Sequence, residues 1–166
     1  LVVVLLEAYA KLPGFRGECT HRDPPTIGVI APYRHQVKEL ERRILRSSSL
    51  RYLLEMGQLQ VGTVDSFQGQ EKDLVIFSTT RSNPEGRLGF VDNRQRLNVA
   101  FSRARAQLVV IMDGSTVLLA RQRVDSRDLE AEIRDHLYAL WDYAVKIGGW
   151  VRLDTQHFPE FQGVPV

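Results

Sequence analysis

Two dense polar stretches carry the residues of this chain that are best suited to chemistry. The first extends from Val61 to Asp73 and surrounds a glycine with hydroxyl, amide and carboxylate side chains. The second extends from Arg94 to Arg105 and is rich in arginine. Each lies beside an apolar run that is typical of a buried strand, and α/β proteins bind ligands where polar residues gather at strand ends and helix starts. We therefore expect these stretches to form a binding site.

The first stretch offers groups that suit a nucleotide or a nucleic-acid backbone. Thr63 stands at the end of a predicted strand, where its hydroxyl can donate to a phosphate. Gly69 lets the backbone approach a ligand closely, as loops that cradle phosphates require. Glu71 can accept a hydrogen bond from a ribose hydroxyl, as acidic residues do in dinucleotide sites. The alternative is an ordinary turn between two strands, with Asp65 and the other charged residues exposed to solvent.

The second stretch offers positive charge on a predicted helix. Arg96 and Arg103 are seven residues apart, so an unbroken helix would place them on one face with about 20° of drift. Leu97, Phe101 and Ala104 form a separate apolar face that we expect to pack on the sheet. Arginines that point out of a domain favour phosphoryl transfer, because a guanidinium stabilises the charge spreading over the γ-phosphoryl oxygens. The alternative is a surface helix whose arginines pair with neighbouring carboxylates.

Composition limits the classes of protein that fit. The chain has 166 residues, of which 43% are hydrophobic, and this suits about one domain with a packed core. No apolar run approaches the ~18 residues that span a membrane, so we expect no membrane partner. A single cysteine, Cys19, excludes an internal disulfide and a cysteine-cluster zinc site, and the four histidines lack metal-ligand spacing. The net charge of +2 is milder than that of a purely electrostatic nucleic-acid binder.

The elements that must position these residues alternate between strand and helix. Strands are predicted over residues 27–31, 59–64, 74–79, 107–112 and 150–153, and helices over 34–46, 95–105, 115–121 and 128–147. Residues 1–12 fit either a helical stripe or a β-branched strand. Such alternation predicts an α/β fold with a mostly parallel sheet, right-handed crossovers and helices on its faces. We expect one domain over residues 1–153 and a surface tail over 154–166.

Together the two stretches resemble motifs V and VI of superfamily 1 helicases, in the subgroup that holds the nonsense-mediated-decay helicase, senataxin and the replication nuclease-helicases. Residues 61–73 match the family pattern VDxFQGxEKD, and residues 94–105 match RRLNVALTRAR except at Gln95, Phe101 and Ser102. Only the change at Gln95 removes a charged group. The stretch IGVIAPYRHQ, residues 27–36, resembles motif IV.

The resemblance covers about residues 1–120 and implies the second RecA-like domain of such a helicase, a three-layer α/β domain with a helix near residues 1–12. It implies that Arg103 is the arginine finger, with Arg96 as the second candidate. Gly69, Glu71 and Gln68 are the implied nucleotide-binding residues, with Gly69 on the γ-phosphate side and Glu71 at the ribose.

Four residues are the implied contacts to nucleic acid: Thr63, Tyr33, Pro32 and Arg34. Tyr33 offers a ring that can stack on a base and a hydroxyl that can donate. Arg34 can reach a phosphate or can simply begin the following helix. The resemblance also implies that Gln36 supports the site and that Gln68 and Asp65 couple the two sites. Lys72 and Asp73 are expected to be structural, and Arg81-Ser82-Asn83 matches the family without an assignable role.

Two elements of a complete helicase are missing from this chain. It contains no G-x-x-x-x-G-K-[ST] loop, and no Asp-Glu pair follows a strand to hold magnesium. In the resembling helicases both lie on a first RecA-like domain, ATP binds between the two domains, and single-stranded RNA or DNA lies across both. The resemblance therefore implies that ATP and Mg²⁺ bind jointly with a first RecA-like domain, and that this chain alone is inactive as an ATPase.

The sequence also bears on where the protein acts and on alternatives to a helicase motor domain. The resemblance implies an intracellular protein of the cytoplasm or nucleus. The main alternative is a non-catalytic RecA-like module that binds nucleic acid or a partner motor. A Rossmann dehydrogenase is disfavoured, because no G-x-G-x-x-G follows any predicted strand.

Overall fold

The computed structural model describes residues 1–15, 24–89, 94–122 and 131–153. The chain divides into two compact units, which are described separately. Unit 1 is drawn from residues 1–80 and 93–112, and unit 2 is drawn from residues 81–92 and 113–166. Within the described part of the chain, no helix combines the length and the apolar character needed to cross a membrane.

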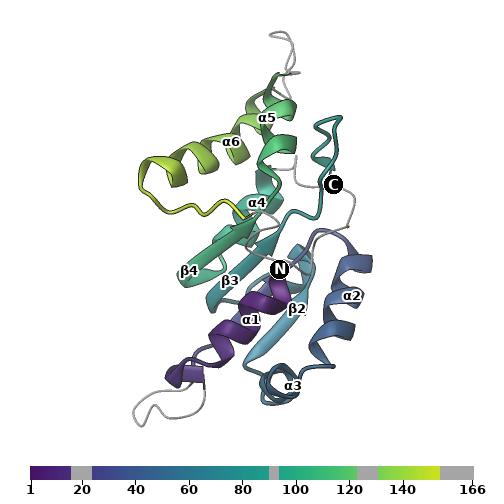
Figure 1. Cartoon of the computed structure of the whole chain (residues 1–166), viewed down its shortest axis with the longest axis vertical. Helices are drawn as coiled ribbons and strands as arrows, with labels where there is room; N and C mark the ends of the chain where they lie inside the picture. The colour runs from purple at the N-terminus through teal and green to yellow at the C-terminus, as the bar shows by residue number, and fades with distance from the viewer. Residues whose placement is uncertain (16–23, 90–93, 123–130, 154–166) are drawn as a thin grey trace. The chain divides into compact units, whose positions relative to one another are not determined.

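Unit 1 is a parallel sheet layered with helices (Figure 1). Its strands are β1 (Ile27–Ile30), β2 (Leu59–Gly62), β3 (Lys72–Ser78) and β4 (Ala104–Ile111), in the order β2-β1-β3-β4, and every neighbouring pair is parallel. Its helices are α1 (Val2–Ala10), α2 (Arg34–Ile44), α3 (Ser48–Glu55) and α4 (Arg94–Phe101), with short 3₁₀ turns η1 (Pro13–Phe15) and η2 (Val64–Phe67). The predicted α/β, RecA-like class with a parallel sheet is confirmed.

Side chains of the two central strands, β1 and β3, alternate between the two faces of the sheet and are buried on both faces. Ile27 and Val29 of β1 and Ile76 of β3 belong to a core that they share with apolar residues of α1, α2 and α3. The intervening positions face the other way, where the rings of Phe77 and Phe101 meet at right angles with centroids 5.4 Å apart. Strands buried on both faces consist of continuous apolar runs, which explains why the sequence predicts β1 and the apolar part of β3.

The strand order reverses at β1. The chain passes from β1 to β2 through α2 and α3 on one face, and it returns across β1 to β3 through η2 on the other face. The last crossover, from β3 to β4, uses α4 on the same face as η2, as ring contact between Phe77 and Phe101 indicates. Crossovers of one hand that move in opposite directions must use opposite faces, so this layering follows from the strand order.

Phe67 fixes the first polar stretch against the sheet. Its side chain is fully buried, and a Cβ on Gly28 of β1 would lie 2.8 Å from the ring. A Cβ on Gly62 of β2 would collide with Ser66 Oγ in η2. Glycine at these two strand positions therefore lets η2 lie directly on the sheet.

A carboxylate ties the amino ends of three strands together. One oxygen of Asp73, in β3, accepts hydrogen bonds from the backbone N–H and the hydroxyl of Thr26 at 2.8 and 2.9 Å, immediately before β1. The other oxygen pairs with Arg105 of β4 at 2.8 Å. Burial acts to raise the pKa of Asp73, but the hydrogen bonds from Thr26 and the charge of Arg105 outweigh burial and lower it. This geometry gives Asp73 the structural role expected of it.

Unit 2 contains α5 (Gly114–Gln122), α6 (Ala131–Lys146) and the segment of residues 81–89. Its buried apolar side chains include Leu88, Val117, Ala120 and Leu137. Gly148, with a φ of +68°, follows the end of α6.

Three element predictions were incomplete or wrong. The helix predicted over 34–46 is followed in the sequence by a serine run at residues 47–49, which indicates only the end of that helix, yet α3 begins at Ser48 and buries Leu50 and Leu53 in the core. The helix predicted over 95–105 ends at Phe101, and β4 begins at Ala104. Residues 150–153 form no strand, and Val151 is 79% exposed. The tail over 154–166 lies outside the described residues, so its boundary stays a prediction.

We predict that Gly28→Ala destabilises the protein by about 1–3 kcal/mol, because the new methyl group overpacks against Phe67. Urea unfolding followed by circular dichroism measures the change. Gly114→Ala is the matched control, since a Cβ there meets nothing within 4 Å, and it should leave stability unchanged or raise it by up to ~1 kcal/mol. Equal stability of the two variants would contradict the close packing of Phe67 on β1.

We predict that Asp73→Asn lowers stability at neutral pH and removes part of its acid dependence. A carboxyl with a lowered pKa stabilises the fold above its unfolded-state pKa of about 3.9, and this contribution is lost as the pH falls through the lower folded-state value. Wild type and variant should therefore converge in urea midpoint as the pH drops below about 4. A difference in urea midpoint that stays constant from pH 7 down to below about pH 4 would contradict a stabilising role for the Asp73 carboxylate.

Candidate functional site

The loop between η2 and β3 lies at the amino edge of the sheet and is accessible. Gly69 has a φ of +76°, in the left-handed region that favours glycine. A Cβ there would touch nothing within 4 Å, so glycine serves the backbone conformation and not close packing. Gln68 and Glu71 on either side are also exposed. The predicted nucleotide-binding residues therefore share one open loop.

Arg103 reaches this loop from the end of α4. Its Nε donates to the carbonyl of Val99 at 2.9 Å, Nη1 donates to the carbonyl of Gln70 at 3.2 Å, and Nη2 donates to Ser102 Oγ at 2.9 Å. A backbone hydrogen bond also joins the two stretches, since Lys72 N–H donates to the carbonyl of Arg103 at 2.8 Å. The two polar stretches are thus in direct contact, although more than thirty residues separate Gln70 from Arg103.

Arg96 lies apart from this contact. It sits in the first turn of α4, whereas Arg103 lies beyond the last helical residue, Phe101. The chain tightens where the helix ends, with Arg103 N–H donating to the carbonyl of Ala100 at 3.3 Å. The expectation that Arg96 and Arg103 share one helical face is therefore wrong, and the two arginines flank opposite ends of α4.

The residues proposed to contact nucleic acid follow the carboxyl ends of β1 and β2. Thr63 comes directly after β2 and is half-buried, and its hydroxyl has no hydrogen-bond partner among the described residues. Pro32 is buried after β1, Tyr33 is half-buried at the N-cap of α2, and Arg34 is exposed as the first residue of that helix. The four residues therefore gather at one edge of neighbouring parallel strands.

These two groups of residues lie at opposite edges of the sheet. Strand β3 runs from Lys72 at the amino edge to Ser78 at the carboxyl edge, and at about 3.3 Å per residue its six steps cover roughly 20 Å. The first polar stretch crosses this distance on η2, from Thr63 at one edge to Glu71 at the other. The two groups of predicted contacts therefore lie at opposite edges of the sheet, and a single crossover connects them.

Gln36 marks the carboxyl edge between β1 and β3, where the strand order reverses. Its Nε2 donates to Ser78 Oγ at 2.9 Å, which joins α2 to the end of β3. Its Oε1 is buried and lacks a hydrogen-bond partner among the residues that the structure describes. Parallel sheets bind ligands at such a reversal point, and leaving a buried acceptor unpaired is unfavourable. This placement agrees with a supporting role for Gln36.

In unit 2, Asp113 holds the segment whose role the sequence left open. Its carboxylate accepts from Ser82 Oγ at 3.0 Å, Thr116 Oγ1 at 2.6 Å and Ser115 N–H at 3.0 Å. Asn83 N–H donates in turn to Thr116 Oγ1 at 2.9 Å. Burial acts to raise the pKa of Asp113, but the hydrogen bonds from Thr116 and Ser82 outweigh it and lower the pKa. The segment is therefore anchored to the start of α5.

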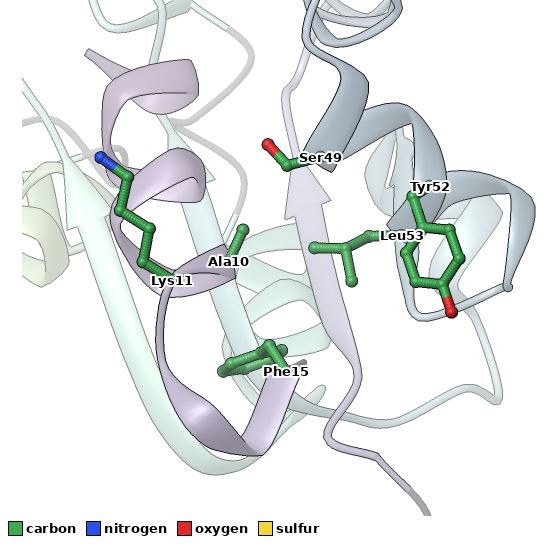
Figure 2. Close-up of a pocket in the computed structure, with 6 residues that line it drawn as sticks. All are labelled: Ala10, Lys11, Phe15, Ser49, Tyr52 and Leu53. Carbon is green, nitrogen blue, oxygen red and sulfur yellow. The ribbon is translucent and has the colours of Figure 1, made fainter. Parts of the chain in front are cut away.

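A hollow of about 470 Å³ lies between α1, η1 and α3, away from these residues. Figure 2 shows the side chains that line it, which are Ala10, Lys11, Phe15, Ser49, Tyr52 and Leu53. None of the predicted site residues lines this hollow. The described residues also include no group of three or more His, Cys, Asp or Glu side chains that could hold a metal ion.

Comparison with known proteins places both polar stretches inside a recognised domain. The family model described as an AAA domain matches residues 5–115. A putative helicase MOV-10 of Gallus gallus is 41% identical over 129 residues, which cover 73% of this chain and 13% of that protein. The DNA replication ATP-dependent helicase/nuclease DNA2 of Mus musculus is 41% identical over 99 residues, which cover 59% of this chain and 8% of that protein.

A regulator of nonsense transcripts 1 homolog of Arabidopsis thaliana is 42% identical over 99 residues, or 60% of this chain and 8% of that protein. The chain thus spans 8–13% of the length of these relatives. The matched interval contains the sheet of unit 1, the Gly69 loop and Arg103. The chain belongs to the superfamily 1 helicases of the nonsense-mediated-decay and senataxin group, of which it covers a single domain.

Proposed function

We propose that this chain is the second RecA-like motor domain of an ATP-dependent nucleic-acid helicase or translocase. The observation that carries the proposal is the contact between Arg103 and the Gly69–Glu71 loop at the amino edge of the sheet. It brings a guanidinium beside an open glycine loop and an exposed carboxylate, which are the groups that a nucleotide needs from a second domain.

Each residue at the amino edge has a proposed task. Arg103 acts as the arginine finger, since a guanidinium stabilises charge that spreads over the γ-phosphoryl oxygens during transfer. Glu71 accepts from the ribose, and Gly69 lets the backbone approach the γ-phosphate side, with Gln68 beside it. Arg96 is the second candidate for the finger, but its position at the far end of α4 makes Arg103 the better placed.

The other half of the nucleotide site belongs to a first RecA-like domain. That domain would hold Mg²⁺, which neutralises phosphate charge when it is bound. This chain contributes donors and a ribose acceptor, so we propose that it hydrolyses no ATP alone.

Single-stranded RNA or DNA is the proposed partner at the carboxyl edge. Thr63 has a hydroxyl that no described group engages, and Tyr33, Pro32 and Arg34 extend the same edge. Contacts to phosphate and sugar position a strand without reading its sequence. We propose an intracellular motor, in the cytoplasm or nucleus, that moves along such a strand.

The crossover through η2 is the proposed coupling between the two sites. Val64 and Phe67 are buried, so the turn between Thr63 and Gly69 is firmly packed on the sheet. A change in nucleotide contact at one end is therefore transmitted along a short, packed segment to the strand-binding end. Opening and closing of the cleft between two domains, a hinge motion, would then step the motor.

We predict that Arg103→Ala in the parent protein lowers the kcat for ATP about 10³- to 10⁵-fold, as loss of an arginine finger does, and leaves nucleic-acid affinity largely intact. Arg42→Ala is the matched control, because Arg42 is a half-exposed arginine of α2 that pairs with Glu39. Steady-state ATPase assays with RNA and DNA strands measure the effect. Unchanged turnover would favour a non-catalytic module, and turnover by the isolated chain would refute the divided site.

We predict that Thr63→Ala weakens binding of single-stranded nucleic acid about tenfold, the loss expected for one hydrogen bond to a charged phosphate. Fluorescence anisotropy with a labelled oligonucleotide measures the affinity. Ser49→Ala, which removes an exposed hydroxyl from α3, should bind like wild type. Equal affinities for both variants would remove Thr63 from the proposed nucleic-acid contacts.

A further inference from the structure

The guanidinium of Arg103 is partly occupied by its own domain. An arginine carries five N–H donors. Three of them donate to Val99 O, Gln70 O and Ser102 Oγ, so two N–H groups have no acceptor among the described residues. All three acceptors belong to unit 1, and two of them are backbone carbonyls. The side chain is therefore held in one orientation before any ligand arrives.

The carbonyl of Val99 is available for this because α4 ends early. The last carbonyls of a helix lack partners within it. Arg103 N–H, which would bond Val99 O in a continued helix, donates to Ala100 O instead. The free carbonyl accepts from Arg103 Nε at 2.9 Å and from Ser102 Oγ at 3.2 Å. The end of the helix thus provides the anchor for the arginine.

Ser102 completes the arrangement through its hydroxyl. A hydroxyl has one hydrogen and two lone pairs. Its hydrogen points to Val99 O, so its lone pairs are free to accept from Arg103 Nη2 at 2.9 Å. The same carbonyl therefore orients both the serine and the arginine that the serine holds. Gln70 O, in the loop that contains Gly69, fixes the third side of the guanidinium.

We propose that Ser102 is a positioning residue, which holds the guanidinium of Arg103 so that its two remaining N–H groups are presented to the γ-phosphate. This inference rests on the proposed function and adds to it how the finger is oriented. A long, flexible side chain that is already ordered loses less conformational entropy when its ligand binds. Because the γ-phosphoryl charge that the finger stabilises develops in the transition state, we expect the benefit in kcat more than in the KM for ATP.

Three substitutions at this exposed position separate the hydroxyl from its bulk. Ser102→Thr keeps the hydroxyl, Ser102→Val has nearly the shape of threonine without it, and Ser102→Ala removes it with little change in volume. We expect Ser102→Thr to behave like wild type, and we expect Ser102→Val and Ser102→Ala to release the Nη2 contact. The comparison of Thr with Val is the decisive one.

The first readout needs no activity. In the full 166-residue chain, ¹⁵N NMR reports solvent exchange of the Arg103 Nε–H, with exposed Arg46 beyond α2 as an internal reference. We expect exchange at Arg103 to be at least several-fold slower than at Arg46 in wild type and Ser102→Thr, and to accelerate in Ser102→Val and Ser102→Ala. Equal exchange rates in the Thr and Val variants would overturn the proposal.

The second readout is turnover by the parent protein. We expect kcat to fall about tenfold in Ser102→Val and Ser102→Ala with little change in the KM for ATP, and to be retained in Ser102→Thr. If Arg103→Ala abolishes turnover while Ser102→Val matches Ser102→Thr, only the positioning role is overturned. If Arg103→Ala leaves turnover unchanged, the proposed function and the positioning role fall together.

Discussion

The burial of one aromatic ring fixes the segment that links the two edges of unit 1. Phe67 lies against the backbone of β1 at Gly28, where no side chain intervenes, and this contact holds η2 flat on the sheet. The crossover begins at Thr63, beside the carboxyl edge, and delivers Gly69 and Glu71 to the amino edge. Residues 68 to 71 are themselves exposed, so Phe67 is the buried side chain that packs the start of this loop on the sheet. A packing constraint thus sets the positions of groups proposed for two different ligands.

The amino edge is held together by contacts between the two polar stretches themselves. Asp73 and Arg105 form an ion pair that also engages Thr26, while the backbone and side chain of Arg103 bond to Lys72 and Gln70. Some residues of the family pattern therefore serve the fold, and their neighbours are left exposed for a ligand. Arg105 and Arg103 are only two positions apart, yet they have different contacts. Arg105 joins β4 to Asp73 of β3, whereas Arg103 lies against the exposed loop that contains Gly69.

Much of the fold follows from local pattern, and the rest depends on distant contacts. The strands were predicted because runs such as Leu74–Phe77 are apolar on both faces. The helix α3 was missed because a serine run resembles a helix end, although Leu50 and Leu53 fill the core.

The early end of α4 at Phe101 was not predicted because no glycine or proline directly follows it in the sequence. The contact of Ser102 with Arg103 was also missed, because it forms only where the Arg103 side chain turns back to Val99. The anchoring of Ser82 by Asp113 joins residues 31 positions apart, which no local pattern reveals.

If this domain provides half of a divided ATP site, the parent protein must contain the other half. In this proposal the first RecA-like domain provides the phosphate-binding lysine and the carboxylates for magnesium, since this sequence contains neither a G-x-x-x-x-G-K-[ST] loop nor an Asp-Glu pair after a strand. The most direct measurement is to determine the coding sequence upstream of Leu1. We expect it to encode, in the same reading frame, a G-x-x-x-x-G-K-[ST] loop and a strand that ends in Asp-Glu. A parent protein that contains neither element would contradict the claim.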